Sequence, residues 1–268
     1  MLPARRDRGP GGRIAWRSPP GRFHPFSGLG TSMSEILPGV HLVDGVNPSP
    51  DFTTNMLLLK DAKGGSWTLV DTGLPPGKSP HDVVAQLEKY CAAHNVALSA
   101  IRNILITHLH ADHTGNLKAL AERTKARVFT HWIEACYIAG DPPYKGPGMP
   151  PPDRVDISEK LRDGDHVDVF DGVVAYATPG HTPGHTSYYC PTRKILFAGD
   201  SVFNVGGKIV ISQKQYTFSQ SLALISLRRM ASWDIDAVVM YHGAPILHGA
   251  GPMLKAAARE GYGTDPEN

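Results

Sequence analysis

The run HLHADH concentrates potential metal ligands, because it places His108, His110, Asp112 and His113 within six residues. It directly follows Ile101–Thr107, an apolar segment that predicts a buried strand. A loop at the end of such a strand can turn all four side chains toward one point. Neutral imidazole nitrogens and carboxylate oxygens are ligands that zinc accepts, at about 2.0–2.2 Å. The spacing therefore predicts a metal site rather than a polar surface loop.

Further segments carry residues of the same kind, in a fixed order along the chain. They are the turn Asp71-Thr72-Gly73, the run TPGHTPGH with His181 and His185, the pair Gly199-Asp200, and His242. Together with THLHADHTG, these segments resemble the metal-binding motifs of the metallo-β-lactamase superfamily. The resemblance covers roughly residues Met33 to Ala258 and keeps the order that the motifs have in that family.

The resemblance implies a pair of metal ions, with zinc expected and iron or manganese as alternatives. Seven side chains would hold them: His108, His110 and His181 for the first ion, Asp112, His113 and His242 for the second, and Asp200 as a bridge between the two.

Two of these assignments are choices between neighbouring histidines. In the family the first histidine of the TPGHTPGH pair is the ligand, so His181 is assigned and His185 is expected to support the site without binding metal. His248 is an alternative to His242. We prefer His242 because it directly follows the apolar segment Ala237–Tyr241, as the other ligands follow theirs.

The resemblance also assigns roles in catalysis. Two cations about 3.5–4 Å apart can lower the pKa of a shared water and polarise a substrate carbonyl. Asp112 is the expected catalytic residue, since its carboxylate is placed to orient that water or to carry its proton. Asp71 is expected to accept a hydrogen bond from a ligand or from loop backbone. These roles predict a metal-dependent hydrolase that acts on a small-molecule acyl substrate.

The residues of these motifs are most similar to those of the hydroxyacylglutathione hydrolase branch. This similarity predicts cleavage of an ester or thioester. Larger members of that branch hold glutathione with an added helical domain. Only 26 residues follow His242 here, so we expect no such domain and an acyl substrate other than glutathione.

Three other activities share much of this pattern. One is a lactonase of the acyl-homoserine lactone type, for which Tyr144 and Met149 would line an apolar channel, and another is a β-lactamase. The third is a mononuclear iron persulfide dioxygenase, with His108, His181 and Asp200 as its ligands. A non-enzymatic binding protein of this fold is disfavoured, because all seven expected ligands are present.

The order of apolar segments predicts an α+β fold, in which two runs of short strands are each followed by helices. Strands are predicted at Val40–Val43, Asn55–Leu59, Trp67–Val70, Ile101–Thr107, Arg127–Thr130, His166–Phe170, Val173–Ala177, Thr186–Cys190, Lys194–Ala198 and Ala237–Tyr241. Helices are predicted at Pro80–His94, Asn116–Arg123, Trp132–Ile138, Ser219–Met230 and Pro252–Ala258. Such a pattern is typical of an αββα sandwich, two packed mixed β-sheets with helices on the outer faces.

The segment Gly140–Asp153 (GDPPYKGPGMPPPD) interrupts this pattern. Its six prolines and three glycines exclude regular secondary structure. A loop of this length inside a compact domain is usually functional or mobile. An active-site lid and a passive surface loop are both consistent with the sequence.

Residues 1–32 differ in composition from the remainder, with six arginines, one acidic residue and many glycines and prolines. We interpret them as a disordered basic tail, either from a mis-assigned translation start or serving as a targeting segment. Residues 33–268 then form one metallo-β-lactamase-like domain.

Charge, hydropathy and cysteine content restrict the partners and the location. The net charge is +2 and the part after the tail is mildly acidic, which predicts no nucleic-acid binding. No apolar run approaches the ~20 residues that span a bilayer, so no membrane insertion is expected. The isolated cysteines Cys91, Cys136 and Cys190 favour a reducing compartment, and the cytoplasm is the expected location.

Overall fold

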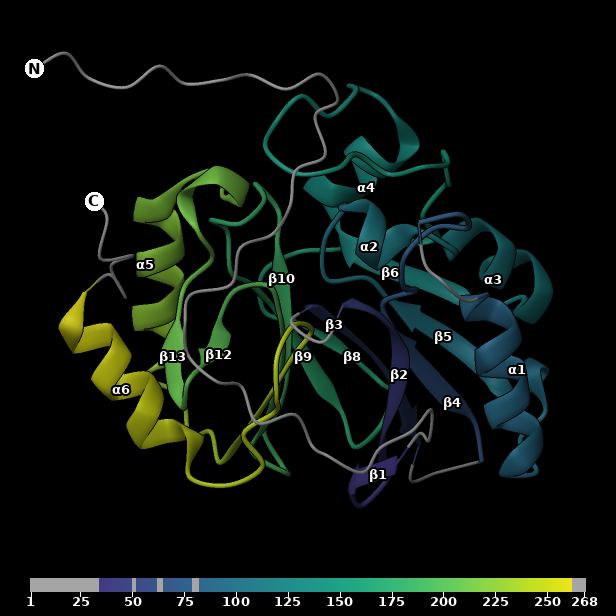
Figure 1. Cartoon of the computed structure of the whole chain (residues 1–268), viewed down its shortest axis with the longest axis horizontal. Coiled ribbons are helices and arrows are strands. Elements are labelled where there is room, and N and C mark those ends of the chain that lie inside the picture. The colour runs from purple at the N-terminus through teal and green to yellow at the C-terminus, as the bar shows by residue number, and fades with distance from the viewer. Residues whose placement is uncertain (1–33, 50–51, 62–64, 79–81, 262–268) are drawn as a thin grey trace, which may run out of the picture.

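The computed structural model describes residues 34–49, 52–61, 65–78 and 82–261 (Figure 1). The predictions made for residues 1–32 lie outside the described residues. Among the helices in the described ranges, none combines the length and the apolar character that crossing a bilayer would need.

The first half of the chain builds a seven-stranded mixed sheet in sequential order. Its strands are β1 (Ser34–Leu37), β2 (Val40–Ser49), β3 (Phe52–Lys60), β4 (Trp67–Val70), β5 (Ile101–Leu105), β6 (Arg127–His131) and β7 (Glu159–Leu161). Neighbours from β1 to β4 pair antiparallel, and neighbours from β4 to β7 pair parallel. The connections carry α1 (Val83–Ala93), η1 (Leu98–Ala100), α2 (Ala111–Thr114), α3 (Leu117–Thr124) and α4 (Trp132–Ala139).

The second half builds a five-stranded mixed sheet in the order β14-β11-β10-β9-β8. These strands are β8 (Asp165–Val167), β9 (Val173–Ala177), β10 (Thr186–Cys190), β11 (Ile195–Gly199) and β14 (Ala237–Met240). Only β11 and β14 pair parallel within it. A separate hairpin joins β12 (Phe203–Val205) to β13 (Lys208–Val210), and η2 (Lys214–Tyr216), α5 (Gln220–Met230) and α6 (Ala250–Glu260) complete the chain.

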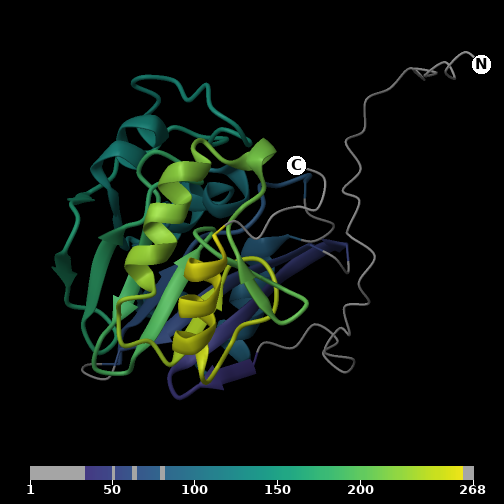
Figure 2. The same ribbon diagram turned by 90° about the vertical axis from the view of Figure 1, so that its left-hand side faces the viewer.

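Strand periodicity separates three apolar cores, because successive side chains point to opposite faces of a sheet. In β3, Met56 and Leu58 pack beneath the helices of the first half, whereas Leu57 and Leu59 pack between the two sheets. In β11, Phe197 faces the space between the sheets, and its neighbours face α5 and α6. The predicted αββα sandwich is therefore confirmed. Figure 1 shows α1 and α3 on one side and α5 and α6 on the other, and Figure 2 looks onto α5 and α6.

Some short elements were not predicted. β7 buries only Leu161 and the β12–β13 hairpin buries only Ile209, and strands of three residues are too short to show a clear apolar pattern. The strand predicted at His166–Phe170 ends earlier, at Val167, because Phe170 takes a left-handed backbone conformation with φ of 57°. The segment Gly140–Asp153 contains no helix or strand, as predicted.

The parallel strand pairs bring the chemical motifs to one edge of the sandwich. The carboxyl ends of β4 and β5 are neighbours, and so are those of β11 and β14. Asp71 follows β4, and the HLHADH run follows β5 after two residues. Asp200 directly follows β11, and His242 follows β14 after one residue. Both sheets therefore contribute to one site.

Candidate metal centre

Three buried imidazoles converge on a point. Nδ1 of His110 lies 3.0 Å from Nε2 of His108 and 2.9 Å from Nε2 of His181. Burial lowers the pKa of all three histidines, so they are neutral. Neutral imidazole is the form that binds a metal ion.

The partners on the far side of these rings decide which nitrogens carry protons. Nε2 of His110 lies 2.9 Å from the Pro147 carbonyl oxygen, which can only accept, so this nitrogen is the donor. Thr107 donates its hydroxyl proton to Asp71, and it therefore accepts from Nδ1 of His108 at 3.1 Å. The nitrogens of His108 and His110 that face each other are then both unprotonated. Two converging lone pairs of this kind are suited to a cation.

A second group combines Asp112, His113 and His242. Nε2 of His242 lies 3.2 Å from Oδ2 of Asp112, and Nε2 of His113 lies 3.8 Å from the same oxygen. Within this group, and likewise within the first, the ligand atoms all lie within 4.8 Å of one another.

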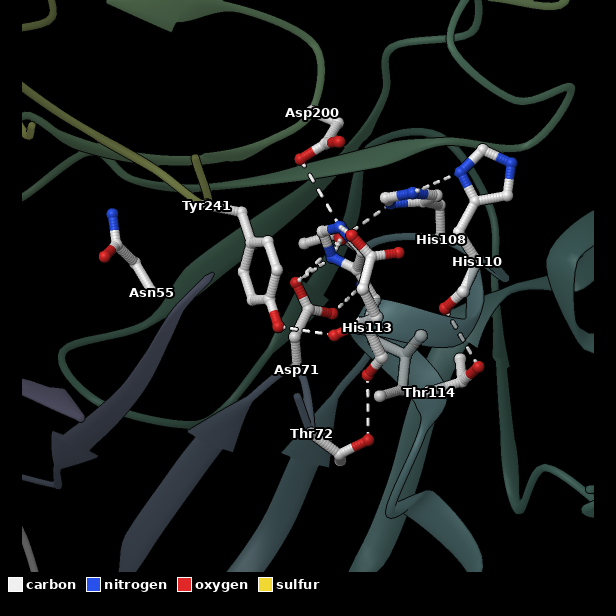
Figure 3. Close-up of polar contacts among 12 residues, drawn as sticks. Asn55, Asp71, Thr72, His108, His110, His113, Thr114, Asp200 and Tyr241 are labelled. Atoms are coloured by element: carbon white, nitrogen blue, oxygen red, sulfur yellow. Dashed lines mark hydrogen bonds and ion pairs between the residues drawn. The ribbon is translucent and has the colours of Figure 1, made fainter. Parts of the chain in front are cut away.

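Asp200 lies between the two groups. Its Oδ2 is 3.4 Å from Nε2 of both His181 and His242, and its Oδ1 is 3.4 Å from Nε2 of His113. Figure 3 shows His113 between Asp200 on one side and Asp71 on the other. The carboxylate thus contacts histidines of both groups.

Two buried atoms of this cluster lack the partners that buried polar atoms normally have. Nε2 of His113 and Oδ1 of Asp200 make no hydrogen bond within the described part of the chain. Nδ1 of His113 donates to Asp71 at 2.8 Å, so Nε2 is the nitrogen that faces Asp200 and that remains to bind a metal ion. A ring nitrogen and a carboxylate oxygen that face each other in the interior, with no other partner, fit a cation between them.

The electrostatics of the second group indicate the same need for positive charge. Burial alone would lower the pKa of His113, but Asp200, Asp71 and Asp112 together raise it well above its ordinary value. Burial also opposes protonation of His242, yet Asp200 and Asp112 raise its pKa to about 10. Protons on these histidines take the place that a metal ion would fill, because metal binding displaces protons from its ligands.

Asp71 and His185, the two residues expected to support the site without binding metal, lie beside the cluster. Asp71 accepts hydrogen bonds from the backbone and hydroxyl of Thr107, each at 2.8 Å, as well as from His113. Nδ1 of His185 pairs with Thr178 at 2.9 Å, and its Nε2 accepts from the Asp200 backbone at 3.0 Å. Both nitrogens of His185 are therefore engaged away from the cluster.

His248, the alternative to His242, lies elsewhere. Its side chain is 82% exposed and pairs with Asp236 at 3.2 Å. His242 is the histidine that joins the cluster.

The buried carboxylate of Glu134 was not predicted to be part of the site. Glu134 lies on α4 and accepts hydrogen bonds from Leu109 N at 2.7 Å, Thr182 Oγ1 at 2.9 Å and Gly184 N at 2.7 Å. It thereby ties the loop of His108 and His110 to the loop of His181. Burial raises the pKa of Glu134 to about 7, against the effect of these three donors. An acid within an otherwise apolar helical segment was the signal in the sequence.

Asn55 on β3 fixes the loop that carries His242. Its amide donates to the carbonyl oxygens of Met240 at 3.0 Å and Gly243 at 2.8 Å, on either side of His242. Its backbone N–H also donates to the Tyr241 carbonyl at 2.8 Å. A polar residue within the apolar strand Asn55–Leu59 was the corresponding sequence signal.

Replacing Asn55 by alanine is expected to lower the free energy of unfolding by about 1–3 kcal/mol, because two carbonyl groups near the site lose their partner. Urea denaturation of the metal-free protein measures this loss. The variant should also bind added zinc more weakly in a chelator competition. Asn103→Ala is the matched control, since Asn103 is also buried but bonds to Thr68 and Arg127 instead. Equal zinc binding by both variants would contradict the role given to Asn55.

The family model of the metallo-beta-lactamase superfamily matches residues 49–242 of this chain. That span contains all seven side chains that converge at the site. The chain belongs to this superfamily. The order of motifs read from the sequence and the αββα sandwich agree with this membership.

Individual members of the superfamily are similar over most of the domain. A probable metallo-hydrolase of Bacillus subtilis, YflN, is 29% identical over 209 residues, 68% of this chain and 76% of that protein. A hydroxyacylglutathione hydrolase of Pseudomonas aeruginosa is 34% identical over 166 residues, and the match covers 60% of this chain and 52% of the relative. This metallo-β-lactamase superfamily protein therefore matches about half the length of that hydrolase. The predicted metal-dependent hydrolase agrees with both names.

The structural comparison agrees with the family assignment. A metallo-beta-lactamase family protein from Thermus thermophilus, TTHA1429, superimposes with a TM-score of 0.61 at 27% identity. The superposition covers 84% of this chain and 79% of that protein.

Proposed function

We propose that this protein is a dinuclear zinc hydrolase that cleaves an ester or thioester bond in a small acyl substrate. The observation that carries the proposal is the pair of ligand groups on either side of Asp200. A mononuclear iron site with His108, His181 and Asp200 would leave the convergence of Asp112, His113 and His242 without a purpose. Two groups therefore favour two ions.

The donor set suits zinc. Imidazole nitrogens outnumber carboxylates and no thiolate takes part, a combination that zinc accepts in tetrahedral or five-coordinate sites. Two divalent ions held there would lower the pKa of a water molecule and polarise a carbonyl group. The unpartnered Nε2 of His113 and Oδ1 of Asp200 support this fit.

The protein's own contribution to the chemistry lies with Asp112. The side chains of Asp112 and His242 are each 12% exposed, whereas His113 is fully buried, so Asp112 lies on the side that solvent reaches. Burial would raise the pKa of Asp112, but His113 and His242 hold it well below its usual range. Asp112 is therefore an ionised carboxylate that can accept a hydrogen bond from a water molecule and orient it for attack.

Two exposed apolar side chains extend from segments that touch the site. Met149 is 45% exposed, and its carbonyl accepts from the backbone of Ala111 at 3.1 Å. Phe218 is 51% exposed, and its backbone donates to the His181 carbonyl at 3.0 Å. Such a rim suits a substrate with an apolar group beside its carbonyl, which keeps a lactone with an acyl chain as the second candidate.

Acid release in a pH-stat tests the proposal, because hydrolysis of thioesters, esters, lactones and β-lactams all liberate protons. We expect zinc-loaded protein to turn over acyclic esters or thioesters best, with two zinc ions bound per chain by elemental analysis. A clear preference for lactones would support the second candidate. One bound iron per chain and no acid release above a metal-free sample would overturn the hydrolase and favour the persulfide dioxygenase.

A further inference from the structure

The proline-rich segment Gly140–Asp153 is docked onto one of the site's histidines through its backbone. Nε2 of His110 lies 2.9 Å from the Pro147 carbonyl oxygen, and the Ala111 backbone donates to the Met149 carbonyl at 3.1 Å. These two hydrogen bonds flank Gly148. Residues 147 to 149 therefore lie directly against the ring of His110.

Gly148 is required for this close approach. A Cβ built at this position would lie 2.3 Å from Nε2 of His110, and the backbone φ is +85°. Both the space and the conformation favour glycine.

Tyr144 holds the carbonyl in place. Its hydroxyl donates to Pro147 O at 2.8 Å, and its ring makes an edge contact with His110 at 5.8 Å between centroids. Pro147 O thus receives two hydrogen bonds, one from a tyrosine in its own segment and one from His110. The carbonyl is anchored before any ligand arrives.

We propose that the Pro147 carbonyl and Gly148 form a backbone cradle that positions His110, holding its proton on Nε2 so that Nδ1 stays free to face His108 and His181. A carbonyl oxygen cannot donate a proton. If His110 carried its proton on Nδ1 instead, it would lose this hydrogen bond and its unprotonated Nε2 would be buried without a donor. Partners of this kind fix the tautomer and orientation of metal-binding histidines. The segment is on this basis neither a passive loop nor a freely opening lid.

This inference rests on the proposed metal role of His110, and its test distinguishes a failure of the cradle from a failure of the proposed function. The variant is Gly148→Ala, and Gly164→Ala is the matched control. Gly164 has nearly the same φ, +86°, but a Cβ there meets nothing within 4 Å. The two substitutions therefore impose similar backbone strain, and only one adds an atom against His110.

The first measurement uses metal-free protein labelled with ¹⁵N-histidine. In the wild type and in Gly164→Ala, we expect His110 to carry its proton on Nε2, with that proton protected from exchange with water. In Gly148→Ala the protection should be lost. A wild-type His110 protonated on Nδ1, or with an Nε2 proton that exchanges freely, would overturn the cradle even if the variant failed to fold.

The second measurement is zinc affinity, by competition with a chromophoric chelator. Loss of such a supporting partner weakens metal binding about 10–100-fold, so Gly148→Ala should lose that much affinity for one zinc ion while Gly164→Ala loses none. Equal affinity in all three proteins would refute the cradle and leave the proposed function standing. Absence of zinc binding by the wild type, with the protected Nε2 proton present, would refute the proposed function and leave the cradle standing.

Discussion

Replacing Asp200 by alanine is expected to lower hydrolysis of the best substrate by more than about 100-fold. Loss of a residue that merely supports a ligand already costs about 10–100-fold in metal affinity or activity, and Asp200 lies within 3.4 Å of ligand nitrogens in both groups. The zinc content per chain should fall as well. Steady-state kinetics and elemental analysis measure the two effects.

The fold should survive this substitution. The backbone N–H of Asp200 donates to Nε2 of His185 at 3.0 Å, and alanine keeps this hydrogen bond. Asp168→Ala, which removes an exposed carboxylate, is the control and should keep wild-type activity. Near wild-type turnover by Asp200→Ala, with two zinc ions still bound, would show that the two-metal assignment is wrong.

Replacing Glu134 by alanine is expected to destabilise the protein by about 3 kcal/mol or more. Three buried donors lose their acceptor together, and each unsatisfied donor costs about 1–3 kcal/mol. Urea unfolding of the metal-free protein measures the loss. Glu122→Ala, at an exposed position on α3, should change stability by less than about 0.5 kcal/mol. A similarly small effect at Glu134 would contradict its role in joining the two ligand loops.

The same carboxyl group predicts a pH dependence. Burial raises the pKa of Glu134 to about 7 in the folded protein, from an ordinary value of 4.5. The folded state then holds a proton that the unfolded chain releases, so stability falls as the pH rises from 4.5 to 7. The shift corresponds to about 3 kcal/mol. Glu134→Gln lacks this titration, so its stability should decline less than that of the wild type over the same interval.

The convergence of the candidate ligands was predictable from the sequence because their spacing is local. Four of them lie in one short run, and the remainder follow apolar strands whose ends meet at one edge of the sandwich. The two-sheet architecture was predictable for a similar reason, since the strands that build the cores are apolar and bounded by turn residues. Features that depend on neighbouring residues, such as apolar strands and the polar side chains that follow them, therefore lie where the sequence predicts them.

The supporting contacts were not predictable, because they join segments that are distant in the chain. Asn55 reaches carbonyls more than 180 positions away, and Glu134 binds a backbone group 50 positions away. The Pro147 carbonyl meets His110 across 37 positions. No periodicity marks such contacts. Only an unusual residue type in an apolar segment hints at the first two.

The division of the ligands between the two sheets has a consequence for the cohesion of the fold. His242 lies 134 positions after His108 in the chain, and the two halves that carry them meet mainly through apolar side chains between the sheets. Metal bound by ligands from both halves would cross-link the two sheets and so stabilise the folded state. Removal of the metal by a chelator would then lower stability as well as activity. Without this cross-link, the two sheets would separate, and the region between them would become accessible to proteases, before either sheet unfolds.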